Sequence, residues 1–205
     1  MGREAVWHST SAPDVILSPV IKQHPLSYTR RLEQRCTKQI RLVVIHCTEL
    51  PDLAMARTWG EKVVYPDSRT GNSGHFYIDR DGSIEKWVPI DRVAHHVRGY
   101  NPLSIGIELV NNGRYPDWFK SSHQRMSEPY PHQQIEALVT LLNHLAAELP
   151  GLDSITGHED LDTDLLPSED DSDILIRRKL DPGPLFPWPV IMDQIPLKRL
   201  TNKNL

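Results

Sequence analysis

The two ends of one loop carry residue types that bind metal ions and stabilise negative charge. His158 stands near the start of the loop 157–183, and Lys179 and Asp181 stand near its end. A loop with closed ends can present its end residues to one point, where His46 would complete a three-ligand set. A catalytic zinc typically takes three protein ligands, and imidazole with carboxylate suits zinc, although other first-row metals accept the same ligands. We therefore expect one zinc ion per chain.

An acidic side chain inside an apolar segment adds a second kind of chemistry. Glu108 interrupts the apolar run 103–110, and burying a carboxylate without a partner is costly and raises its pKa. Beside a metal, such a carboxylate can take a proton from water and pass it to a leaving amine, while Lys179 can stabilise an oxyanion. These residues predict metal-assisted hydrolysis. The chain has ten histidines, so spacing alone leaves other ligand triples open.

Three segments are expected to be strands that position these side chains. The β-branched, apolar run 41–46 ends in a histidine, which is typical of a buried central strand with a site residue at its exit. The run 103–110 holds the glutamate, and Gly106 within it indicates that other backbone or a ligand comes close. A short strand at 153–156 would lead into the second histidine.

Helices and a hairpin complete the expected framework. Apolar residues recur at helical spacing through 132–148, and a second helix should begin after the N-cap Asp52 and run to residue 59, with room to continue to 64. An Asp-Gly turn between alternating runs predicts a hairpin at 75–88. The pattern of strands and helices is typical of an α/β protein.

Two loops allow more than one interpretation. The loop 111–131 is rich in aromatic residues, and Tyr115 and Trp118 could line a substrate groove or cover the core. The loop 161–176 is an acidic insertion, which could be a solvated loop or a lid over the groove.

Composition limits the partners and the compartment. The net charge is −4, so there is no overall basic field that would attract nucleic acid. No apolar run is long enough to span a membrane. Two cysteines do not form a disulfide framework. The segment 1–27 lacks the pattern of a secretory signal, so we expect a cytoplasmic protein, with signal-independent export or release by phage lysis as the alternative. We also expect the protein to be a monomer.

The domain boundaries follow from the same patterns. We expect an N-terminal arm at 1–40 packed on a single domain at 41–190, and a C-terminal tail at 191–205. Within the arm, residues 14–17 and 20–21 could form short extended pieces. The last residues, 201–205, should be frayed.

Six short motifs occur together in a characteristic order. They resemble the zinc-dependent N-acetylmuramoyl-L-alanine amidases of the AmpD type, which are related to phage lysozyme-type amidases and peptidoglycan recognition proteins. The motifs are Val44-Ile45-His46-Cys47-Thr48, Ser73-Gly74-His75-Phe76-Tyr77-Ile78-Asp79-Arg80-Asp81-Gly82, Val93-Ala94-His95-His96, Ser104-Ile105-Gly106-Ile107-Glu108-Leu109, Thr156-Gly157-His158-Glu159-Asp160 and Lys179-Leu180-Asp181-Pro182-Gly183-Pro184.

The resemblance implies a mixed central β-sheet with helices packed on its faces, a metal in a groove at one side, and a role for each candidate residue. It implies that the zinc ligands are His46, His158 and Asp181. It also implies that Glu108 is the general base and acid and that Lys179 stabilises the oxyanion. The bond cleaved would join the lactyl group of N-acetylmuramic acid, or of its anhydro form, to L-alanine of the peptidoglycan stem peptide. His96 falls where the family has a histidine near the groove and could contact substrate.

Two positions depart from the pattern of the wider group, and the second of them places the chain with the AmpD-like branch. Gly74 stands where some phage-type members carry a tyrosine near the metal, and Asp181 replaces the cysteine ligand of the phage and recognition-protein branches. Two other functions remain open. The chain could bind peptidoglycan fragments or the sacculus without cleaving them, or it could be a metallohydrolase for a different amide.

Overall fold

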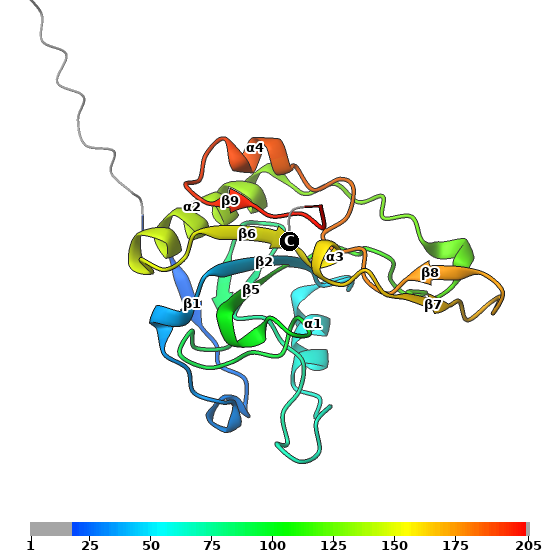
Figure 1. The fold of residues 1–205 in the computed structure, drawn as a ribbon, viewed down its shortest axis with the longest axis horizontal. Coiled ribbons are helices and arrows are strands. Elements are labelled where there is room, and N and C mark those ends of the chain that lie inside the picture. The colour runs from blue at the N-terminus through cyan, green and yellow to red at the C-terminus, as the bar shows by residue number, and fades with distance from the viewer. Residues whose placement is uncertain (1–17, 204–205) are drawn as a thin grey trace, which may run out of the picture.

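A seven-stranded sheet forms the centre of the computed structural model, which describes residues 18–203 (Figure 1). The strands lie in the order β1-β4-β3-β5-β2-β6-β9. Their bounds in that order are Ile21–Gln23, Ile84–Lys86, Phe76–Ile78, Ser104–Leu109, Leu42–Cys47, Ser154–Gly157 and Lys198–Arg199. The predicted mixed sheet is confirmed, because β3 and β4 pair antiparallel and every other neighbouring pair is parallel.

The predicted strands and hairpin are present, and both ends of the described chain add edge strands. The hairpin β3–β4 turns at Gly82, whose φ of +85° suits glycine. Of the two extended pieces expected in the arm, residues 14–17 lie outside the described residues, and residue 21 begins β1. The tail supplies β9, which pairs with β6. The arm and the tail therefore extend the same sheet.

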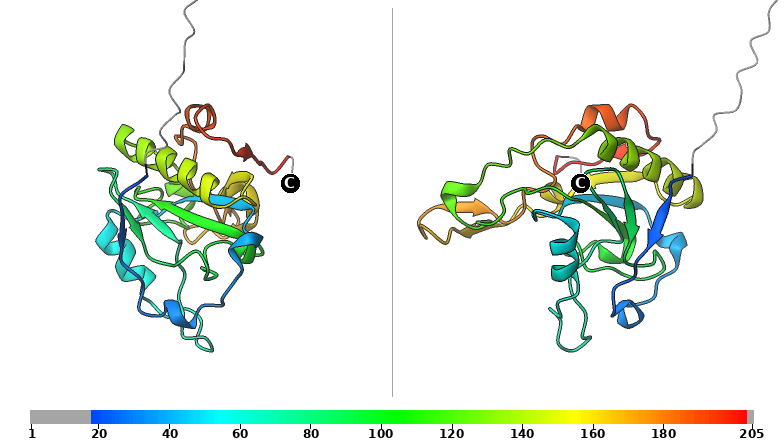
Figure 2. Two further views of the ribbon diagram at one scale, coloured as in Figure 1. Left: turned by 90° about the vertical axis from the view of Figure 1, so that its left-hand side faces the viewer. Right: turned by 180° about the vertical axis from the view of Figure 1, so that it is seen from behind.

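Helices cover both faces of the sheet (Figure 2). α2 spans His132–Glu148, as predicted. α1 spans Leu53–Gly60, and the Asp52 side chain caps it by accepting a hydrogen bond from the Met55 backbone N–H at 2.7 Å. α1 stops short of residue 64 because the backbone there pairs with Thr70 instead.

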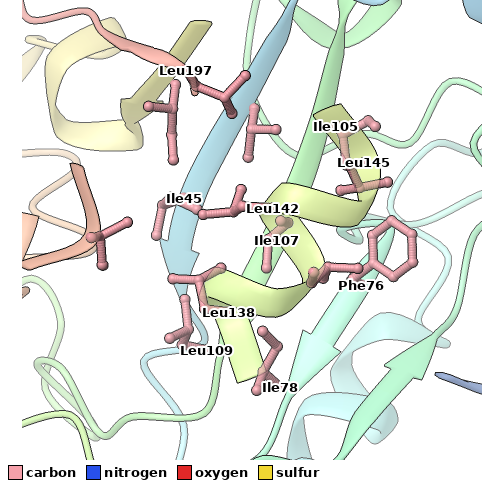
Figure 3. Packing of buried hydrophobic residues seen from close by; sticks show 14 of the residues in the cluster. Ile45, Phe76, Ile78, Ile105, Ile107, Leu109, Leu138, Leu142, Leu145 and Leu197 are labelled. Atoms are coloured by element: carbon pink, nitrogen blue, oxygen red, sulfur yellow. The ribbon is translucent and has the colours of Figure 1, made fainter. Parts of the chain in front are cut away.

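Alternate residues of the central strands point to opposite faces, and one face forms the main core with α2. Figure 3 shows this packing, in which Leu138, Leu142 and Leu145 of α2 lie against Ile45 and Ile107. The opposite face carries a second cluster, which includes Leu50, Ala56, Tyr77, Trp87 and Ala94. The candidate site residues of β2 and β5 lie on this second side of the sheet.

The acidic insertion folds into a small hairpin of its own. β7 (Leu165–Pro167) and β8 (Leu175–Arg177) pair antiparallel as a separate two-stranded sheet. Together with part of the loop 111–131, this hairpin extends away from the central sheet (Figures 1 and 2). The remaining helices are short: α3 (His158–Leu161), α4 (Trp188–Met192), and the 3-10 turns Thr29–Arg31, Thr37–Gln39, Asn101–Leu103 and Ser121–His123. No helix among residues 18–203 is long and apolar enough to cross a membrane.

Candidate active site

Three predicted ligands converge at the carboxyl end of β2. His46 Nδ1 lies 3.0 Å from both His158 Nδ1 and Asp181 Oδ2, and His158 Nδ1 lies 3.1 Å from the same carboxylate oxygen. All three residues are buried. β2 supplies the first ligand, the start of α3 supplies the second, and the end of the loop 157–183 supplies the third.

The chemistry of this cluster fits a zinc ion. Ligand atoms about 2.0–2.1 Å from a tetrahedral zinc would lie roughly 3.3 Å apart, so the observed separations require only a small adjustment. Asp181 Oδ1 is buried and has no hydrogen-bond partner among the described residues. Such an oxygen is expected to have a partner, and a metal ion would provide one.

The protonation states also suit metal binding. Burial lowers the pKa of His46 to about 4, although the Asp181 carboxylate opposes this effect. Burial alone would raise the pKa of Asp181, but His158, His46 and Lys179 together lower it well below its ordinary value. At neutral pH, His46 is therefore a neutral imidazole and Asp181 an ionised carboxylate, the forms in which these side chains bind metals.

Glu108 lies next to the ligand cluster because β5 pairs with β2 in register. His46 and Glu108 are directly paired across the two strands. Burial raises the pKa of Glu108 well above its ordinary value; Asp181 adds to this effect and Lys179 opposes it. A Cβ atom on Gly74 would lie 2.8 Å from Glu108 Cγ, so the glycine leaves room for the Glu108 side chain as it is placed here.

Backbone and side-chain hydrogen bonds close the ends of the loop 157–183. The Glu159 backbone N–H donates to the Asp181 carbonyl at 2.9 Å, which joins the residue after the ligand His158 to the other loop ligand. Tyr130 Oη donates to the Pro182 carbonyl at 2.7 Å. The Arg177 guanidinium donates to the carbonyls of residues 159 and 162. The expectation that this loop brings its end residues together is therefore confirmed.

A buried arginine that sequence reasoning missed holds the segment before Lys179. Arg114 donates from Nε and Nη2 to the two carboxylate oxygens of Glu49 at 2.7 and 3.0 Å. It also donates to the Gln124 side chain and to the carbonyls of residues 177 and 178. All five guanidinium N–H groups are therefore paired, and the segment 177–178 is tied to the loop after β2.

The ligand cluster opens into a groove of about 590 Å³. Glu108, Lys179 and His96 line it, as do several residues that sequence reasoning missed: Trp59, Lys62, Tyr65, Arg98 and Arg178. Lys62 Nζ lies 3.2 Å from the centre of the Trp59 ring. The sequence did offer one signal for this part of the groove lining: Trp59 lies near the end of the helix that follows the strand carrying His46.

The two aromatic residues expected to contact substrate lie beside the groove but not in its lining. Trp118 donates from Nε1 to the Glu49 carbonyl at 3.0 Å. Its ring packs edge-on against that of Trp59, with 6.0 Å between the ring centres. The Tyr115 ring packs against the Trp118 ring, with 5.7 Å between the ring centres. The structure therefore brings Trp59, and not Trp118 or Tyr115, to the groove surface, because Trp118 is held against the Trp59 ring and the Glu49 carbonyl.

The acidic hairpin is also absent from the groove lining within residues 18–203. Its tip is attached to the neighbouring loop, where the Asp170 carboxylate accepts hydrogen bonds from the backbone and hydroxyl groups of Ser121 and Ser122. At its base, Arg98 and Asp164 form an exposed ion pair. The hairpin thus braces the loop 111–131, and its described position does not cover the groove.

The fold and this site define an α/β protein with a His-His-Asp candidate metal centre in an open groove. The family model described as N-acetylmuramoyl-L-alanine amidase matches residues 37–184, most of the chain. The chain therefore belongs to the N-acetylmuramoyl-L-alanine amidase family, as its motifs predicted.

Curated relatives support this assignment. The chain is 30% identical to the N-acetylmuramoyl-L-alanine amidase AmiD of Escherichia coli over 81% of its own length, and it spans 57% of that protein. It is also 30% identical to the 1,6-anhydro-N-acetylmuramyl-L-alanine amidase AmpD of Enterobacter cloacae, over 72% of this chain and 76% of the relative.

Solved structures share the fold. AmiD from E. coli, in complex with the substrate anhydro-N-acetylmuramic acid-L-Ala-D-γ-Glu-L-Lys, superposes with a TM-score of 0.59 at 28% identity over 80% of this chain and 61% of that chain. The Drosophila peptidoglycan recognition protein PGRP-SA gives a TM-score of 0.60 at 16% identity over 90% of this chain and 95% of that chain. The latter likeness shows the fold alone.

Proposed function

We propose that the chain hydrolyses the amide between N-acetylmuramic acid, or its 1,6-anhydro form, and L-alanine of the peptidoglycan stem peptide, with one zinc ion held by His46, His158 and Asp181. The observation that carries this proposal is the convergence of these ligand atoms within 4.8 Å of one another. They converge in a groove that also contains Glu108 and Lys179. The names of the relatives supply the substrate class.

The bound zinc would act as a Lewis acid, polarising the scissile carbonyl and lowering the pKa of water. Glu108 would take a proton from the attacking water and deliver it to the leaving amine, which suits a carboxyl group whose pKa is raised by burial. Lys179 would stabilise the negative charge that develops on the carbonyl oxygen. Since both side chains line the same groove as the ligands, the site has a residue for each step.

The physical form of the substrate is part of the proposal. The AmpD relatives are named for the anhydro form, so we propose soluble anhydro-muropeptides as the preferred substrate and recycling in the cytoplasm as the setting. Intact sacculi, reached by export or by phage release, are the alternative, since phage endolysins are also among the relatives.

One digestion experiment tests the activity and the substrate together. Intact sacculi and soluble anhydro-muropeptides would each be incubated with zinc-loaded protein, with and without a zinc chelator, and the products read by mass spectrometry. We expect free stem peptide beginning at L-alanine, more from the soluble substrate, and none after chelation. If zinc-loaded protein binds both substrates and cleaves neither, the chain is a binding module; release of a different fragment would indicate another amide.

A further inference from the structure

A line of four polar groups runs from the candidate metal centre into the sheet. His46 Nε2 lies 3.0 Å from His96 Nδ1, and His96 Nε2 lies 3.2 Å from Ser104 Oγ. Ser104 Oγ in turn donates to the Tyr100 carbonyl at 2.8 Å. The imidazole of His46 thus contacts the ligand cluster through Nδ1 and the line of hydrogen bonds through Nε2.

Only one arrangement of protons gives every contact in this line a donor and an acceptor once Nδ1 of His46 binds a metal. The His46 proton is then on Nε2, so it is donated to His96 Nδ1. The remaining proton of a neutral His96 is on Nε2 and is donated to Ser104 Oγ. The Ser104 hydroxyl keeps its own proton for the Tyr100 carbonyl, which can only accept.

The backbone around His96 is shaped to hold its ring in this line. A Cβ atom on Gly106 would lie 2.6 Å from His96 Cγ and 2.7 Å from Nδ1, so the ring lies directly against the β5 backbone. This contact explains the glycine within a buried strand. The Asn101 side chain accepts hydrogen bonds from the backbone N–H groups of His96 and Val97, at 3.0 and 2.8 Å, and so fixes the turn that carries the ring.

Alternation along β5 brings the supporting groups to one face. Ser104, Gly106 and Glu108 are two residues apart, so their side-chain positions share the side of the sheet that faces the site. Along this face, the strand supplies a hydroxyl that accepts from His96, a space for its ring, and the candidate general base. One strand therefore organises both the proposed catalytic carboxylate and the support of a ligand.

We propose that His96, backed by Ser104, is a positioning residue for the metal centre: it holds His46 in the tautomer and orientation in which Nδ1 presents its lone pair to the metal. This inference rests on the proposed function and deepens it. A metal-binding histidine commonly donates its other ring N–H to a neighbouring acceptor, and loss of such a partner typically costs 10–100-fold in metal affinity. Here the acceptor is a second imidazole.

The first test measures zinc affinity by competition with a chromophoric chelator, and it needs no substrate. His96→Leu keeps much of the side-chain bulk and removes the acceptor, so we expect zinc affinity to fall by about 10–100-fold. His96→Asn places an amide oxygen near the position of Nδ1 and should recover part of the loss. Ser104→Ala should cause a smaller loss, because the contact between the two histidines remains.

The neighbouring His95 provides the matched control. Its side chain is partly buried on the same segment, and its Nδ1 has no hydrogen-bond partner among the described residues. His95→Gln should leave zinc affinity unchanged. Thermal unfolding of each zinc-free variant separates positioning from stability: a residue with only a structural role would lower the unfolding temperature of the zinc-free protein without weakening zinc binding.

The second test reads the protons directly in the unaltered protein. Two-bond ¹H–¹⁵N correlation spectra of the zinc-loaded chain should show both His46 and His96 protonated on Nε2. Protonation of His96 on Nδ1, or a His96→Leu variant that binds zinc as tightly as the wild type, would overturn the positioning role. Absence of zinc binding by the wild type would overturn the proposed function as well, so the two failures are distinguishable.

Discussion

The two halves of the candidate site are held in place by different means. His46 and Glu108 lie on neighbouring strands in direct register, and glycines make room for the groups packed against them. His158, Lys179 and Asp181 lie near the two ends of the loop 157–183, which is held by hydrogen bonds from side chains such as Arg114 and Tyr130. We call these the strand half and the loop half.

This difference has consequences for stability and for mutation. Backbone register fixes the strand half, and the paired central strands of a sheet usually open only with global unfolding. The loop half depends on a few distant side chains, so one substitution far from the metal centre can displace a ligand. We therefore expect substitutions in the strand half to alter the chemistry of the site directly. Substitutions that affect the loop half should act by displacing its ligands and its lysine.

The largest effect on activity should come from the carboxylate of the strand half. Glu108→Gln keeps the shape of the side chain and removes the base, so kcat/KM should fall by about 10²–10⁴-fold. Zinc content, measured by elemental analysis, should stay at one ion per chain because Glu108 is not one of the proposed ligands. Full activity in this variant would show that another group takes the proton.

The next largest effect should come from a substitution outside the loop half that removes one of its supports. Arg114→Met leaves the Glu49 carboxylate buried without its partner, and breaking a buried ion pair in this way costs about 3–5 kcal/mol in the free energy of unfolding. Lys179 and Asp181 should also shift, because the carbonyls of residues 177 and 178 lose their donor. Denaturant unfolding and kcat/KM would measure the two effects.

A double variant separates the loss of stability from the displacement of the loop half. Arg114→Met combined with Glu49→Gln removes the unpaired charge, so the free energy of unfolding should partly recover. Activity should stay reduced by roughly 10–100-fold, since misplacing a catalytic group by about 1 Å is costly whatever the stability. If activity recovers together with stability, the arginine only stabilises the fold and does not position the loop half.

A smaller effect tests the glycines of the strand half. In Gly106→Ala, the new Cβ meets the His96 ring at 2.6 Å, and overpacking of this kind costs about 1–3 kcal/mol in the free energy of unfolding. Adding His96→Ala should restore the lost stability because the ring is gone, whereas zinc affinity should remain low. Recovery of both would show that the ring matters only for packing.

The smallest effect should come from the tip of the acidic hairpin. Asp170→Ala removes the acceptor for Ser121 and Ser122, so amides of residues 168–176 should exchange faster with solvent while kcat/KM stays unchanged. Altered KM would instead indicate that the hairpin covers the substrate.

The pH dependence of the same contact follows from the hydrogen bonds. The Ser121 backbone N–H lowers the pKa of Asp170 below its ordinary value, desolvation opposes this effect, and Ser122 lowers the pKa further. A carboxylate with a lowered pKa contributes its full stabilisation above its unfolded pKa of about 3.9, and loses it as the pH falls through the folded pKa. NMR titration of the two serine amides should therefore show the contact persisting below that value.

Periodicity and turn residues predicted the regular elements where local and tertiary preferences agree. α2 occupies the predicted residues, and the Asp-Gly turn is the hairpin. The expectation for α1 was open at its end, because nothing local shows that residues 64 and 65 pair with Thr70. The strands β7 and β8 were missed, since an acidic segment with little alternation gives no strand signal and pairs only when its ends are fixed.

Residue types and their positions along the chain were enough to identify the groups available for chemistry: two histidines and an aspartate that can bind a metal, a glutamate within an apolar strand, and a lysine near the last ligand. Their motifs also determined the family. Only the folded chain shows which aromatic ring reaches the groove, which glycine makes room for which side chain, and which arginine holds the loop half. Those choices depend on contacts between residues far apart in sequence, such as Arg114 with the carbonyls of residues 177 and 178, and local pattern carries no record of such contacts.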